Sequence, residues 1–140
     1  MDMKERTAVC RKAGMNCCQS VLCALGEYTG LPEITGVKLG YGFGGGVLCG
    51  SVCGAVTGGL MAISYCCSDG TNPAEEKPAR VDLGREFEQA FIAEFGTLMC
   101  DELTAECGRD NCEKYIEFGA ECAEKFIQKQ NSCAKPCSGE

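Results

Sequence analysis

The sequence predicts an all-α protein: a single domain related to a four-helix bundle, with a buried central helix rich in Gly and Cys. Three observations predict it. The length of 140 residues fits one domain, apolar residues recur at helical spacing in several segments, and no segment has the alternating pattern of a strand. We expect the domain to span residues 1–130 and to be followed by a loosely ordered, Cys-containing tail over residues 131–140.

The N-terminal third predicts a helix followed by turns. Residues 3–28 have apolar residues at helical spacing, with a break expected at Gly14. Within this segment, Asn16 and Gln19 form a capping-box pattern, which is typical of a helix start. Glycines and a proline fill residues 29–46, so we expect turns and a glycine-rich loop there.

The central segment predicts the buried helix. No charged residue occurs between Lys38 and Asp69, and residues 47–67 read as helix. The run is rich in Gly, Ser, Thr and Cys, so we expect a helix covered by its neighbours rather than a membrane span. A glycine at every fourth position leaves a smooth face on which another backbone can approach closely, and these glycines are Gly50, Gly54 and Gly58.

The C-terminal half predicts a polar loop and three further helices. The loop covers residues 68–79, and a helix starts near Arg80 and ends at Gly96. A short piece over 98–105 and a last helix over 111–130 follow. The helix that starts near Arg80 carries an aromatic stripe at four-residue spacing, made of Phe87, Phe91 and Phe95.

Composition excludes several classes of function. The chain has 14 Cys and no His, so it has no Ser-His-Asp or Cys-His site and no His-ligated metal. The net charge of −7 argues against nucleic-acid binding. No secretory signal follows Met1, so we expect a cytoplasmic protein, in which thiols serve as metal ligands, redox groups or core residues more often than as disulfides.

The cysteines divide into groups by their surroundings. Four lie near predicted helix starts, where unpaired N–H groups and a partial positive charge favour the thiolate, the form that attacks and that binds metal. These are Cys17, Cys53, Cys100 and Cys112. Core packing is expected for Cys10, Cys23, Cys66, Cys67 and Cys122, whereas Cys18, Cys49 and Cys107 are undecided. Cys133 and Cys137 lie on the polar tail.

The glycine loop matches a dinucleotide-binding pattern only superficially. Residues 40–45 read G-x-G-x-x-G, but no strand precedes them and no βαβ unit surrounds them. We interpret the glycines as places where the backbone approaches a cofactor or another helix. The positions concerned are Gly44, Gly45, Gly46 and Gly54.

Several short motifs together resemble one known family. Residues 16–22 (NCCQSVL) are similar to its opening motif, and residues 43–46 (FGGG) with 53–58 (CGAVTG) to its glycine loop and central motif. Residues 95–103 (FGTLMCDEL) and 112–121 (CEKYIEFGAE) are similar to its last two segments. The order is the same as in the C_GCAxxG_C_C family of cysteine-based redox-active proteins. The central motif departs from the family name, reading Cys-Gly-Ala rather than Gly-Cys-Ala. The resemblance implies a helical protein with a redox or metal role for its cysteines.

Three hypotheses follow. The first is an electron-transfer protein that holds an iron–sulfur cluster with Cys17, Cys53, Cys100 and Cys112, since four thiolates are the usual ligand set. The second is a thiol–disulfide oxidoreductase, with Cys49–Cys53 or one of the adjacent pairs Cys17–Cys18 and Cys66–Cys67 as possible partners. The third is a protein that binds or stores Cu(I). We expect a redox partner protein, which the sequence does not identify, and no nucleic-acid or membrane partner; a homodimer is compatible with the sequence.

Overall fold

The computed structural model describes residues 1–133, and within them the chain is helical, as predicted. One pairing of extended backbone occurs in this range, an isolated antiparallel bridge between Val52 and Met99. The α-helices are α1 Met3–Lys12, α2 Cys17–Ala24, α3 Gly26–Thr29, α4 Glu33–Gly40, α5 Gly54–Cys67, α6 Pro73–Phe95, α7 Cys100–Leu103 and α8 Glu113–Cys133. Shorter helical turns are η1 Tyr41–Phe43, η2 Gly46–Gly50 and η3 Gly108–Asn111.

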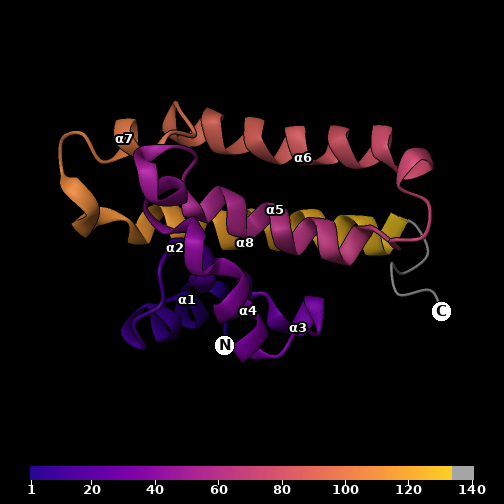
Figure 1. The fold of residues 1–140 in the computed structure, drawn as a ribbon, viewed down its shortest axis with the longest axis horizontal. Coiled ribbons are helices and arrows are strands. Elements are labelled where there is room, and N and C mark those ends of the chain that lie inside the picture. Colours follow the sequence, from indigo (N-terminus) through magenta and orange to yellow (C-terminus); the bar gives the residue numbers. More distant parts are fainter. Residues whose placement is uncertain (134–140) are drawn as a thin grey trace.

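Helix α5 lies at the centre of the molecule. It packs against α2, α8, α6 and α3. Figure 1 shows α5 and α8 side by side, with α6 along one side of them and the short helices α1, α3 and α4 on the other. The fold therefore has three long helices and a group of short ones rather than four helices of similar length, so a simple four-helix bundle is not confirmed. No helix within residues 1–133 is both long enough and apolar enough to cross a membrane.

The helix boundaries in the N-terminal half agree with the predicted ones at Gly14 and differ from them over residues 29–46. The break at Gly14 is confirmed, since that residue has a φ of 95° between α1 and α2. The turns expected over 29–46 are wrong in part, because α4 occupies the middle of that segment. Its glycines serve packing: a methyl group at Gly36 would lie 2.7 Å from Cys23 Sγ, and one at Gly40 would lie 3.0 Å from Gln19 Cγ.

Two later helices begin elsewhere than the sequence predicts. Helix α5 starts at Gly54, not at residue 47, because η2 is a left-handed turn that precedes it. Helix α6 starts at Pro73, not near Arg80, because the Asn72 side chain accepts a hydrogen bond from the Glu75 N–H and Pro73 suits the first helical position. Helix α8 extends to Cys133, into the segment expected to be a tail, and Cys137 lies outside the described residues.

The aromatic stripe predicted for α6 is confirmed, and it holds α8 in position. Phe87 and Phe91 are fully buried, and the ring centroids of Phe95 and Tyr115 are 4.8 Å apart in an edge-to-face pair. The Tyr115 hydroxyl also donates a hydrogen bond of 3.0 Å to the carbonyl oxygen of Leu103. These contacts hold the start of α8 beside α7.

Candidate functional site: four cysteines at helix starts

The four cysteines predicted to form the site all lie at helix starts. Cys17 is the first residue of α2 and Cys100 the first of α7, whereas Cys53 and Cys112 directly precede α5 and α8. Cys17 is half-buried, and the other three are only 5–6% exposed. The starts of α5, α7 and α8 lie at the same end of the molecule (Figure 1).

Backbone pairing and a close helix contact bring three of these cysteines together. The Cys53 N–H donates to the Leu98 carbonyl oxygen at 2.8 Å, and the Cys100 N–H donates to the Ser51 carbonyl oxygen at 2.6 Å. These two bonds flank the Val52–Met99 bridge and place Cys53 beside Cys100. A methyl group at Gly54 would lie 2.8 Å from Cys17 Cβ, so the start of α5 is tight against Cys17.

Cys112 completes the group through its interaction with Cys17. A hydrogen bond from the Cys112 thiol lowers the pKa of Cys17 to about 6, against the opposing effect of burial. Arg11, the backbone N–H of Cys17 and Arg109 lower that pKa further. The same hydrogen bond, burial and the charge of Cys17 raise the pKa of Cys112. One sulfur of the pair is therefore ionised and the other holds the proton.

The remaining two thiols stay protonated near neutral pH. Burial raises the pKa of Cys53 to about 12, and the charges of Cys17 and Cys100 add to the effect. Burial also raises the pKa of Cys100, although Arg109 opposes it. Because the charge of Cys17 raises the pKa of each of the other three thiols, the four form one electrostatic unit with a single thiolate at Cys17.

The start of α2 is held by a capping box, as predicted. The Asn16 side chain accepts a hydrogen bond of 2.8 Å from the Gln19 N–H, and the Gln19 side chain accepts one of 2.8 Å from the Asn16 N–H. Asn16 Nδ2 also donates to the carbonyl oxygens of Gly40 and Tyr41. The cap therefore ties the backbone beside Cys17 to the end of α4.

We expect Asn16→Ala to lower the free energy of unfolding by about 1 kcal/mol or more, since it removes the cap acceptor and two longer-range hydrogen bonds. Urea unfolding followed by circular dichroism measures the change. Asn16→Ser is the matched control, because serine keeps the acceptor for the Gln19 N–H and should lose less. Equal stability of the alanine variant and the wild type would contradict the role of the cap.

The loop before α5 is strained next to the cysteines. Gly45, Gly46, Val47 and Leu48 have φ values of 60°, 69°, 58° and 64°, so four successive residues are left-handed. This conformation costs about 1–2 kcal/mol for each residue with a side chain. Valine and leucine persist there only because the surrounding structure fixes the loop.

The glycines predicted to allow a close approach each lie against another segment. A methyl group at Gly44 would lie 2.7 Å from the Asn16 side chain, and one at Gly46 would lie 2.7 Å from Cys100 Cβ. At Gly45 it would lie 2.9 Å from Arg109 Nη1. The loop therefore packs on the protein itself, on residues that neighbour or belong to the cysteine group.

The undecided cysteines lie outside the group of four. Cys18 is fully buried and its Sγ lies 3.9 Å from the Met61 sulfur, whereas Cys49 and Cys107 are exposed. Of the cysteines expected in the core, Cys10, Cys66 and Cys67 are buried, and Cys23 and Cys122 are half-buried.

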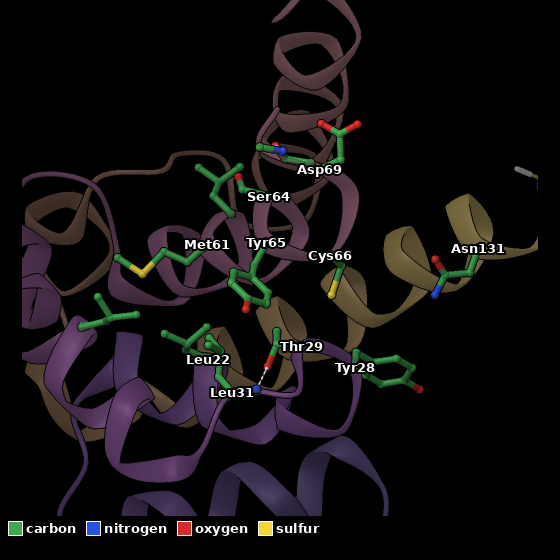
Figure 2. A pocket seen from close by; sticks show the side chains of 14 residues that line it. Leu22, Tyr28, Thr29, Leu31, Met61, Ser64, Tyr65, Cys66, Asp69 and Asn131 are labelled. Carbon is green, nitrogen blue, oxygen red and sulfur yellow. Dashed lines mark hydrogen bonds between the residues drawn. The ribbon is translucent and has the colours of Figure 1, made fainter. Parts of the chain in front are cut away.

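A separate pocket of about 1090 Å³ lies against the second half of α5 (Figure 2). Leu22, Leu31 and Met61 give it apolar walls, and Tyr65 and Asp69 add polar groups. None of the four clustered cysteines lines it. The four clustered cysteines lie at the other end of α5, and the cysteine that lines this pocket is Cys66.

The four thiols match an iron–sulfur cluster in number but not in arrangement. Four Cys ligands are typical of such clusters. Among the side chains that the structure describes, however, no three from Cys, Asp or Glu are grouped so that they could hold a metal ion. Cluster binding would require the thiols to turn toward a common centre.

The sequence did not indicate the two arginines that act on Cys17. Arg11 lies on α1, and Arg109 lies in η3. No motif connects either residue to Cys17, so only the three-dimensional arrangement shows their role.

Comparison with known proteins identifies the family. No curated protein and no solved structure matches the chain. The model of the family described as "Putative redox-active protein (C_GCAxxG_C_C)" matches residues 15–126, a segment that includes all four clustered cysteines. This match covers most of the chain and agrees with the resemblance of the short motifs. The chain belongs to the C_GCAxxG_C_C family of redox-active proteins.

Proposed function

We propose that the protein carries out thiol–disulfide exchange, with Cys17 as the attacking thiolate and Cys112 as the resolving thiol. The observation that carries the proposal is the coupling of these two thiols at the starts of α2 and α8, which lowers the pKa of Cys17 and raises the pKa of Cys112. A thiolate is the nucleophile in such reactions, and a second thiol within reach completes the exchange. Cys17 is also the most accessible of the four clustered cysteines.

The reaction has two steps. The Cys17 thiolate attacks one sulfur of a substrate disulfide; the substrate S–S bond breaks, and the first substrate thiolate leaves and takes a proton from solvent. Cys112 then loses its proton to solvent and attacks the Cys17 sulfur, which releases the second substrate thiol. The substrate disulfide is reduced to two thiols, and Cys17 and Cys112 are oxidised to a disulfide.

The electrostatics of the pair set the order of these steps. The thiolate of Cys17 raises the pKa of Cys112 through the hydrogen bond and through its charge. Once Cys17 is in a mixed disulfide it carries no charge, so both of these effects disappear. The Cys112 thiol then ionises more readily, at the stage at which it is needed.

We expect Cys112→Ser to accumulate the mixed disulfide at Cys17, because the second step has lost its nucleophile. Reduced protein is mixed with 2-hydroxyethyl disulfide, quenched with acid and analysed by intact mass spectrometry. Cys122→Ser, which removes a half-buried thiol from α8, is the matched control and should release the adduct as the wild type does. Equally rapid release by the Cys112→Ser variant would contradict the proposal.

The convergence of four cysteines supports a second candidate, an electron-transfer protein with an iron–sulfur cluster at Cys17, Cys53, Cys100 and Cys112. Iron and sulfide analysis of protein purified without oxygen tests it. A colourless, iron-free protein that cannot be reconstituted would rule it out. Binding of Cu(I) stays a prediction that a copper titration would test.

A further inference from the structure

Arg109 lies at the edge of the cysteine group, on the glycine loop. A methyl group at Gly45 would lie 2.9 Å from its Nη1 and 3.1 Å from its Nη2, so the guanidinium rests directly on the Gly45 backbone. Gly44 and Gly46 flank Gly45. Gly44 contacts Asn16, which caps the helix that begins with Cys17, and Gly46 contacts Cys100. The guanidinium is thus held over the middle of a loop whose flanking residues contact the cysteine site.

Arg109 is exposed, and the ion pairs formed by the side chains that the structure describes use Arg6, Arg11 and Arg80. Arg11 differs in this respect. It lies 3.8 Å from a carboxylate oxygen of Glu113 and donates a hydrogen bond of 3.2 Å to the Met15 carbonyl oxygen. Arg11 is therefore engaged by the protein, whereas the exposed Arg109 rests on the glycine loop beside the cysteine site.

An exposed guanidinium is suited to bind an anion. Its planar fork of N–H donors matches a carboxylate and forms two parallel hydrogen bonds with it. Stabilisation of the Cys17 thiolate does not by itself explain the position of Arg109, because Cys112 and Arg11 both lower the pKa of Cys17 more than Arg109 does. The protein also keeps the position opposite Arg109 free of a side chain, at a left-handed residue where glycine is favoured.

We propose that Arg109 binds a carboxylate of the substrate, so that Cys17 reacts preferentially with small disulfides that carry a carboxylate near their sulfur atoms. This inference rests on the proposed thiol–disulfide exchange. It assigns a substrate class to the Cys17 site and a recognition role to Arg109.

Three aliphatic disulfides that differ in charge test the inference: 3,3′-dithiodipropionate, 2-hydroxyethyl disulfide and cystamine. Second-order rate constants for adduct formation at Cys17 are measured for the wild type, Arg109→Ala and Arg85→Ala. The Arg85→Ala control removes the same charge from an exposed position on α6. The ratio of the dicarboxylate rate to the neutral rate isolates recognition from any general change in Cys17 reactivity.

We expect the wild type to prefer the dicarboxylate and to react most slowly with cystamine. Arg109→Ala should lower the dicarboxylate-to-neutral ratio about tenfold, the size expected for loss of a charge-assisted hydrogen bond, whereas Arg85→Ala should leave it unchanged. An unchanged ratio in Arg109→Ala overturns the recognition role alone, provided that Cys17 reacts with the neutral disulfide. A wild-type protein whose Cys17 reacts with none of the three overturns the exchange function and this inference with it.

Discussion

Replacement of Cys17 by Ser is expected to abolish the rapid reaction of the protein with disulfides at pH 6. A thiol with a pKa of about 6 is half ionised there, whereas an ordinary cysteine is only about 0.3% ionised. The lower basicity of the Cys17 thiolate reduces its intrinsic reactivity by roughly tenfold. The net advantage of Cys17 over an ordinary thiol at this pH is therefore about tenfold, and its serine variant should retain only the slow background of the other cysteines.

The pH dependence of the reaction tests the same assignment. Because the pKa of Cys17 is lowered, its thiolate persists above pH 6 and is lost as the pH falls through that value. The rate constant for 2-hydroxyethyl disulfide should thus reach half its plateau near pH 6. Cys49→Ser, which removes an exposed thiol, should keep this profile. A rate of adduct formation at Cys17 itself that continues to rise through pH 8.5, or a Cys17→Ser protein as reactive as the wild type at pH 6, would contradict the assignment.

Substitutions at the contact between α2 and α5 should also have a large effect, here on the free energy of unfolding. A methyl group at Gly58 would lie 2.7 Å from the Cys18 carbonyl oxygen, and one at Gly54 would lie 2.8 Å from both Cys17 Cβ and the Cys18 nitrogen. Alanine improves helix propensity by about 1 kcal/mol, but the clash with backbone atoms costs about 1–3 kcal/mol. We expect Gly58→Ala to reduce the free energy of unfolding by up to about 2 kcal/mol, and Gly54→Ala also to slow the reaction of Cys17.

Gly84 offers the matched comparison for this prediction. It lies within α6, and a methyl group there would meet only Leu60 Cδ2, at an ordinary 3.4 Å. Gly84→Ala should therefore stabilise the protein by about 0.5–1 kcal/mol, opposite in sign to Gly58→Ala. Urea denaturation of the three variants gives the comparison. If Gly58→Ala stabilised the protein as Gly84→Ala does, α2 and α5 would not be in the close contact described above.

Local signals predicted much of the fold. The capping box at Asn16, the break at Gly14 and the aromatic stripe of α6 each depend on residues close in sequence, and each is confirmed. Helix α4 was missed because its glycines resemble turn signals, whereas they pack against α2. The start of α5 was misplaced because Val47 adopts a left-handed conformation that its β-branched side chain disfavours.

The candidate site was likewise predictable in its local features but not in its long-range contacts. The positions of the four cysteines at helix starts could be inferred from the sequence, since capping residues and glycines are local signals. Their convergence depends on the Val52–Met99 bridge and on the contact of α5 with α2, which no spacing reveals. The unequal roles of Cys17 and Cys112 depend on an interaction between residues far apart in the chain, so the sequence offered the adjacent Cys18, and not Cys112, as a partner of Cys17.

Identification of the first disulfide formed on oxidation tests the pairing most directly. Reduced protein is treated with one equivalent of 2-hydroxyethyl disulfide, quenched with acid, digested and analysed by peptide mass spectrometry. We predict a single predominant disulfide between Cys17 and Cys112. A first disulfide that joins Cys17 to another cysteine or omits it altogether, or the formation of none, would contradict the assignment of these two sulfurs as the redox pair.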